Sequence, residues 1–281
     1  MDLNGAEHAP ASDSAVAPPD DFYYASLYLA PAARHAVRVL EAVRRAISDI
    51  PGLCSDSGVA HLKLAWWQTE LQQLAAATPR HPLARALLPL TQATPALLDV
   101  FAALLDATIN GLNAPPLLDR SALLGWISDQ QGALIEHYIN FGPRVSAAQH
   151  ATLLELACLL ELAYALRGLR QHRRATPLLL PDGSLRAAGL SVDGVRNAQS
   201  SRELHGVLAP EIDWLRAELI ARSVALPRAV RRGQRLITTL AACTAEALAL
   251  TRADDYQVLE RRIELLPVRK LWLAWRIRYW G

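Results

Sequence analysis

The chain has 281 residues, of which 52% are hydrophobic and 20% charged, so it has enough apolar material for a sizeable core and is not an intrinsically disordered protein. Its 29 Lys and Arg residues nearly balance 27 Asp and Glu residues, which excludes the basic signature of nucleic-acid binding, and we expect no nucleic-acid partner. The cysteines Cys54, Cys158 and Cys243 are far apart and form no CxxC pair, so neither a disulfide framework nor a zinc site is expected.

The first 21 residues are rich in acidic residues and prolines, whereas a signal peptide needs a basic start and an apolar run. We expect a disordered leader over residues 1–21. A membrane-spanning helix needs ~18 consecutive apolar residues. Acidic residues interrupt the long Leu- and Ala-rich segments before that length is reached. These residues are Asp99, Asp106, Glu155 and Glu161. We therefore expect a cytoplasmic protein, with peripheral membrane contact left open.

From Pro31 onward, apolar residues recur at helical spacing and residues typical of strands are scarce, which predicts an all-α fold. Proline and glycine separate the segments, because proline cannot continue a helix. No internal repeat or change in composition marks a second domain, so we predict one helical domain over residues 22–281. The predicted helices cover residues 31–50, 58–77, 81–90, 95–112, 119–141, 146–174, 203–223, 227–251 and 254–278.

Four segments carry a resemblance to one family. KLAWWQTELQQLAAATPRHPLARAL, residues 63–87, resembles a helix pair of the squalene/phytoene synthases, with its basic-Leu-x-Trp-Trp opening and later His-Pro. Residues 20–50 resemble the first metal-motif helix of that family, residues 162–181 the second, and residues 258–276 the last helix. The resemblance covers residues 21–278 and implies an isoprenoid synthase-like helical bundle around a central cavity.

Members of this family join two prenyl diphosphates head to head in terpenoid biosynthesis, and Mg²⁺ held by two aspartate-rich helices neutralises the departing diphosphate. The resemblance places the three acidic positions of the first motif at Ser48, Asp49 and Gly52. Only the remnant Asp49 is acidic. It follows Arg45 by four residues, and Arg45 follows Glu41 by four, so an alternative is a self-neutralising stripe on the helix surface.

The second motif is placed at Gly168, Gln171 and His172, none of which is acidic. The nearest carboxylates, Glu155 and Glu161, are six residues apart and project about 120° apart around a helix, so they cannot chelate one ion together. We therefore expect no metal site and no cofactor.

The resemblance also implies three substrate-binding positions, Arg45, Tyr164 and Arg167, of which Tyr164 replaces the asparagine of the family. Arginine pairs with phosphate or carboxylate through the same geometry. We favour pairing of both arginines with carboxylates of the bundle over pairing with a diphosphate.

The C-terminal segment VRKLWLAWRIRYW mixes cations with aromatic residues, a composition that suits a membrane interface. The cations are Arg269, Lys270, Arg276 and Arg278, and the aromatic residues are Trp272, Trp275, Tyr279 and Trp280. The alternative is a terminal helix packed on the bundle, which the resemblance favours, with an exposed tail that contacts lipid.

Two functional hypotheses remain. The first is a catalytically degenerate, transferase-like protein, a pseudoenzyme that holds an isoprenoid or other lipid in its central cavity or acts as an assembly or scaffold protein for a protein partner. The second is a divergent prenyl-diphosphate transferase that uses Mg²⁺. Acidic side chains clustered around the cavity would favour the enzyme.

Overall fold

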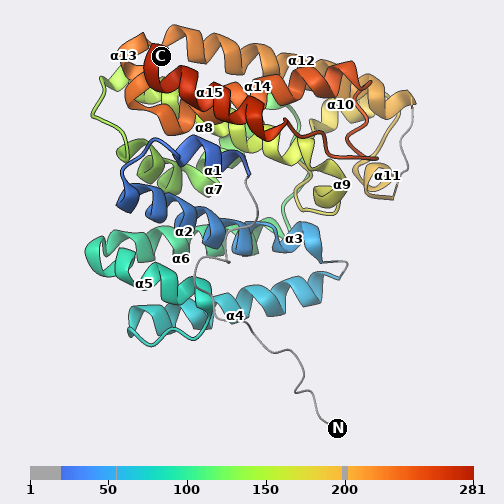
Figure 1. Cartoon of the computed structure of the whole chain (residues 1–281). Coiled ribbons are helices and arrows are strands. Elements are labelled where there is room, and N and C mark those ends of the chain that lie inside the picture. The colour runs from blue at the N-terminus through green and yellow to red at the C-terminus, as the bar shows by residue number, and fades with distance from the viewer. Residues whose placement is uncertain (1–19, 55, 198–201) are drawn as a thin grey trace.

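The computed structural model describes residues 20–54, 56–197 and 202–281. Every regular element in these ranges is a helix, which confirms the all-α prediction (Figure 1). The predicted leader lies outside the described residues except for its last two, Asp20 and Asp21. These two belong to the folded part: Asp20 caps the first helix by accepting a hydrogen bond from the Tyr23 backbone, and Asp21 begins that helix.

The first half of the chain forms one layered group of helices with its own core. Phe101, Leu64 and Ile47 are fully buried in it. Helix α2 contacts α5 and α6, and α4 lies against both α5 and α6 on the outer side (Figure 1). The helices of this half are α1 (Asp21–Ser26), α2 (Pro31–Ser48), α3 (Ile50–Leu53), α4 (Ser57–Ala75), α5 (Pro82–Ala93) and α6 (Ala96–Gly111).

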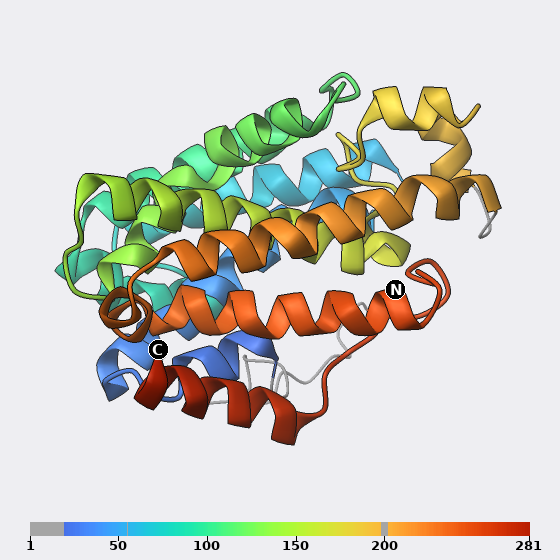
Figure 2. The same cartoon turned by 90° about the horizontal axis from the view of Figure 1, so that it is seen from above.

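The second half forms a larger core built on α7, α8, α12 and α14. Helix α14 packs against α8, α12, α1 and α15, and in Figure 2 it runs between α12 and α15. The helices are α7 (Arg120–Asn140), α8 (Ala147–Arg167), α9 (Leu169–His172), α10 (Asp182–Ala187), α11 (Val192–Asn197), α12 (Arg202–Ala225), α13 (Arg228–Gly233), α14 (Arg235–Ala253) and α15 (Pro267–Trp280).

Two predicted helices end or begin elsewhere in the structure. The helix expected over residues 146–174 ends at Arg167, where Gly168 caps it and the short α9 follows. The helix expected from residue 254 begins only at Pro267, because Asp255 and Tyr256 have positive φ angles of 54° and 57°.

Helix α14 is the one described helix that is long and apolar enough, by length and composition, to cross a membrane. However, 61% of its most apolar window is buried inside the structure. A helix that is apolar on most sides is typical of the centre of a bundle, where neighbours cover it. Its contacts with α1, α8, α12 and α15 account for that composition.

Candidate functional site

The two helices that carry the predicted metal motifs end next to each other. Short helix α3 follows α2, short helix α9 follows α8, and the two contact each other. The Tyr164 hydroxyl donates a hydrogen bond of 3.2 Å to Asp49. The ring of His172 lies between the two motifs, since a Cβ added at Gly52 would lie 3.1 Å from His172 Nδ1 and one added at Gly168 2.7 Å from His172 Cδ2. The fold therefore brings together the motif positions expected from the sequence.

A cavity of about 120 Å³ lies at this junction, between α2, α6, α7, α8 and the segment after α9. Polar side chains form much of its wall, including Asp49, Gln130, Gln131, Glu161 and His172. Sites that enclose ligands of the size of a drug or cofactor usually measure about 300–1,000 Å³. The cavity as it stands is therefore too small for a prenyl chain.

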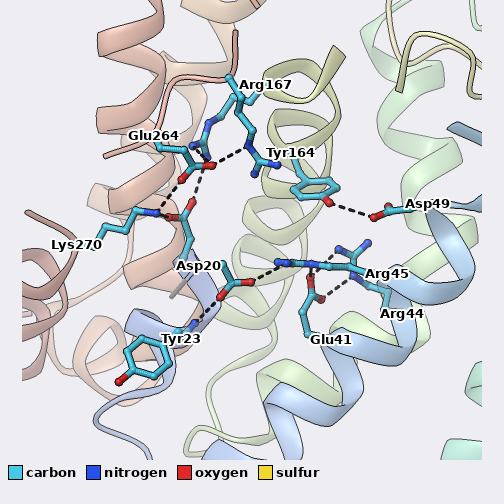
Figure 3. A network of polar contacts seen from close by, with 12 residues as sticks. Asp20, Tyr23, Glu41, Arg44, Arg45, Asp49, Tyr164, Arg167, Glu264 and Lys270 are labelled. Atoms are coloured by element: carbon cyan, nitrogen blue, oxygen red, sulfur yellow. Dashed lines mark hydrogen bonds and ion pairs between the residues drawn. The ribbon is translucent and has the colours of Figure 1, made fainter. Parts of the chain in front are cut away.

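A buried cluster of charges stands beside the cavity. Arg44 donates two hydrogen bonds to Glu41, of 2.7 and 2.8 Å (Figure 3). It donates a third, of 3.1 Å, to Glu161. Arg44 is 2% exposed and Glu41 is 3% exposed. The Tyr138 hydroxyl donates to Glu41 at 3.2 Å. This bidentate pairing and the additional donor provide the close contacts that a buried ion pair needs to offset its desolvation.

The two carboxylates of this cluster differ in their preferred protonation. Burial raises the pKa of Glu41, but the Arg44 and Arg45 guanidiniums outweigh it and hold the pKa below its ordinary value. Burial raises the pKa of Glu161, and the single contact with Arg44 does not compensate because Glu41 and Asp49 add negative charge nearby. Glu41 is therefore the principal counter-charge of Arg44, and Glu161 is the carboxylate that protonates more readily.

Of the expected surface stripe of Glu41, Arg45 and Asp49, the ion pair of Glu41 with Arg45 is confirmed, but the surface position of Glu41 and the pairing of Asp49 were wrong. Glu41 is buried because it faces α7 and α8, where Tyr138 reaches it. Arg45 pairs with Glu41 and, at 2.7 Å, with Asp20. Asp49 bonds to Tyr164 across the helix junction.

Tyr164, which replaces the asparagine of the family, packs against guanidinium groups from α2 and from the segment that precedes α15. Arg44, Arg45 and Arg262 lie 5.6, 5.5 and 5.3 Å from its ring centroid. These distances are within the range of cation–π attraction. The tyrosine thus holds cations by its ring face and Asp49 by its hydroxyl.

Arg167 belongs to a second buried network, which ties the two ends of the described chain together. It donates to Asp21 at 3.1 Å and to the Ile263 carbonyl at 3.2 Å. Lys270 of α15 pairs with Asp21 at 2.7 Å and with Glu264 at 2.9 Å. Lys270 is 3% exposed, so its expected place among the interfacial cations was wrong. The two arginines predicted as substrate-binding, Arg45 and Arg167, both pair with carboxylates of the bundle.

The residues at this junction do not fit a magnesium ion. Mg²⁺ in such enzymes is held by carboxylates together with phosphate oxygens. Within the described ranges, no group of three or more His, Cys, Asp and Glu side chains could hold a metal. Asp49 accepts a hydrogen bond from Tyr164, and Glu161 is paired with Arg44.

Arg44 is the central residue that reasoning from the sequence missed. It lies three residues after Glu41 on a helix whose inner face carries Leu40, Val43 and Ile47. An i,i+3 pair of opposite charges is common on exposed helix faces. A sharper signal was the position of Glu161 within the almost uninterrupted apolar run of α8, which demands a buried cation.

Comparison with known proteins gives the following findings. A dehydrosqualene synthase solved in complex with a ligand superposes with a TM-score of 0.69 at 15% identity, covering 92% of this chain and 90% of that chain. Squalene synthase HpnC from Alicyclobacillus acidocaldarius superposes with a TM-score of 0.60 at 15% identity, covering 84% of this chain and 89% of the other. Among curated protein sequences, none matches.

At 15% identity these structures establish the shared fold, the isoprenoid synthase-like bundle. The family profile of squalene/phytoene synthase matches residues 18–270, which is nearly the whole chain. This chain therefore belongs to the squalene/phytoene synthase family.

Proposed function

We propose that this protein is a catalytically degenerate squalene/phytoene synthase-like protein that acts as a non-catalytic scaffold or assembly protein. The observation that carries the proposal is the cluster of Glu41, Arg44 and Glu161, whose charges neutralise one another. It lies beside the junction of the two motif helices, where Asp49 is the one motif aspartate that remains. Ionisation of a prenyl diphosphate requires divalent cations between clustered carboxylates and the leaving group. The side chains at this junction favour internal neutralisation instead.

The arginines of the site support the same proposal. A diphosphate would have to displace Glu41 and Asp20 from Arg45, and Asp21 from Arg167. Removing a partner from a buried pair is costly, because the remaining charge stays buried without compensation. These arginines therefore stabilise the fold through ion pairs and are not free to bind an anionic substrate.

The cavity favours a scaffold role over a lipid-carrier role. An isoprenoid in the family site would have to enlarge a cavity of about 120 Å³ by moving Trp126 or the segment of Thr176 and Pro177. Experiment can nevertheless distinguish a scaffold from a lipid carrier. Ala107 of α6 faces this cavity, so a larger side chain there would fill it, whereas Ala103, one turn earlier, is exposed and serves as the control position.

The first test is calorimetry with a non-hydrolysable thiolo analogue of farnesyl diphosphate, with and without Mg²⁺, together with a turnover assay on farnesyl and geranylgeranyl diphosphate. We expect no metal-dependent binding and no product, because the carboxylate set cannot complete a metal site. An active dehydrosqualene synthase serves as the positive control. Metal-dependent turnover that Asp49→Asn abolishes would establish the divergent transferase and overturn the proposal.

The second test separates scaffold from carrier by mass spectrometry of lipids extracted from the purified chain. An isoprenoid that is retained by the wild type and by Ala103→Phe, but lost in Ala107→Phe, would establish the carrier version. Absence of lipid in all three proteins is the outcome expected for a scaffold.

A further inference from the structure

A second and larger hollow lies outside the family site and shares no lining residue with it. It is a groove of about 520 Å³, and its lining residues come from α12, α13, α14 and α15. Helix α14 contacts both α12 and α15 and runs between them, so it forms the floor while the other two helices form the walls (Figure 2). The volume is within the about 300–1,000 Å³ that is usual for ligand sites.

The floor and walls of the groove are apolar. Helix α14 contributes the partly exposed Ala242 and, beneath the surface, the buried Ala241 and Ala245. Ile220 of α12 and Trp280 of α15 stand on the walls and are 40% and 68% exposed. An open channel of this kind matches the shape and chemistry of an extended hydrocarbon chain.

The rim of the groove is cationic. Four arginines line it, Arg216, Arg228, Arg231 and Arg276. The acidic residue in the lining, Glu246, is already paired with Arg269 at 2.6 Å. Arg231 donates to the backbone oxygens of Leu226 and Gly281. In the described part of the chain, Arg216 and Arg228 form no ion pair, and the buried Nε of Arg216 has no hydrogen-bond partner. The groove therefore offers uncompensated positive charge to an anion.

An exposed aromatic surface adjoins this rim on α15. Trp272, Trp275, Tyr279 and Trp280 are between 40% and 68% exposed. The Trp275 ring lies 5.6 Å from the Tyr279 ring and 6.4 Å from the Trp280 ring, measured between centroids, so these three side chains form one patch that reaches the groove at Trp280. Tryptophan and tyrosine are enriched where proteins meet the headgroup region of a bilayer.

We propose that this groove binds an anionic phospholipid of a membrane surface. One acyl chain lies along the alanine floor of α14, Arg216 and Arg228 bind the phosphate, and the aromatic patch of α15 rests in the headgroup layer. The combination of hydrocarbon-sized space, unpaired guanidiniums and interfacial aromatic residues favours this occupant over a protein segment. The proposal is independent of the scaffold function, because none of these residues belongs to the family cavity.

The test is co-sedimentation of the full chain with two kinds of vesicle, pure phosphatidylcholine and an equimolar mixture of phosphatidylcholine and phosphatidylglycerol. We expect binding to the anionic vesicles only. Each arginine near an anionic surface strengthens binding about fivefold, so Arg216→Gln with Arg228→Gln should weaken the partition constant roughly thirtyfold. The matched control is Arg80→Gln with Arg85→Gln, which removes two exposed arginines at the other end of the molecule and should change binding far less.

A second variant tests the groove itself rather than its charge. Ala242→Phe keeps every arginine and fills the floor, so it should reduce binding of a soluble short-chain phosphatidylglycerol at least tenfold. Circular dichroism and Tm confirm that each variant is folded. Equal loss of vesicle binding in the groove and control pairs would mean unspecific charge attraction and would overturn the proposal. Two further results would also overturn the proposal. The first is displacement of the protein from the vesicles by inorganic phosphate alone at equal ionic strength, and the second is short-chain lipid binding that Ala242→Phe leaves unchanged.

Discussion

Glu41 and Glu161 contact the same guanidinium of Arg44, yet the folded protein displaces their pKa values in opposite directions. The difference lies in the number of cations that each carboxylate meets. Glu41 contacts both Arg44 and Arg45, whereas Glu161 contacts Arg44 and faces the negative charge of Glu41. The number of neighbouring cations thus makes the charge of Glu41 stabilising and the charge of Glu161 costly.

We predict opposite responses to neutralising the two carboxylates. Glu41→Gln should lower the free energy of unfolding near neutral pH by about 3–5 kcal/mol, because Arg44 and Arg45 lose their shared counter-charge. Glu161→Gln should leave it unchanged or raise it, because the amide oxygen still accepts from Arg44 while a buried charge disappears. Urea denaturation of both variants measures the two values.

The pH dependence provides the internal control for this pair. Glu41 has a lowered pKa in the fold, so its contribution is present above its unfolded pKa of about 4.3 and is lost as the pH falls through the folded value. Glu161 has a raised pKa, so its contribution is present below that unfolded value and is lost as the pH rises through the folded one. Comparable destabilisation by Glu161→Gln at neutral pH would contradict this assignment.

At the scale of elements, the junction of α3 and α9 shows why the substituted motif positions belong together. The His172 ring occupies the space between the helices, and it is confined by Gly52, by Gly168 and by the Tyr164 ring, whose centroid is 5.4 Å away. Burial lowers the pKa of His172, so the ring is packed here in its neutral form near neutral pH. The glycines are needed where this ring packs.

A double-mutant cycle tests this packing. Gly168→Ala should destabilise the protein by about 1–3 kcal/mol, because the new Cβ would lie 2.7 Å from the ring of His172. The same substitution should cost much less in a His172→Ala background, which leaves room for it. Gly125→Ala in α7 is the control: nothing lies within 4 Å of its added Cβ, so it should stabilise by about 0.5–1 kcal/mol. Additive effects of Gly168→Ala and His172→Ala in thermal unfolding would refute the packing argument.

At the scale of the whole molecule, the two ends of the described chain are joined through charge. Asp21 at the start of α1 meets Arg167 of α8 and Lys270 of α15, far apart in sequence. Helices α1 and α15 also contact each other and both contact α14. The network therefore closes the bundle around its central helix.

We predict that Lys270→Ala releases α15 from the bundle. The substitution should lower the free energy of unfolding by about 3–5 kcal/mol, because Asp21 and Glu264 lose a shared and largely buried cation. The neighbouring Arg269→Ala removes an exposed pair with Glu246 and should cost less than about 1 kcal/mol. Limited proteolysis provides a second readout: faster cleavage near residues 260–266 is expected in Lys270→Ala and not in the control. Equal effects of the two variants would show that the Asp21 network does not hold α15.

The sequence by itself determined the helical class, most helix positions and the register of both motif segments, including Asp49, Gly168 and His172. These features depend on local periodicity, on proline and glycine, and on short segments that resemble a family. Helix ends were less accurate, because the break at Gly168 and the positive φ angles at Asp255 and Tyr256 reflect packing of the segments that follow.

Only the tertiary structure decided which charges are buried. Arg44 and Glu161 are 117 residues apart in the sequence, and no local sequence pattern predicts that they form an ion pair. Arg269 and Lys270 are adjacent and of equal charge, yet the first is exposed and the second is 3% exposed. The physical reason is that burial depends on the helix that packs against a face, and that choice is made by long-range contacts of the whole bundle rather than by the residue and its neighbours in sequence.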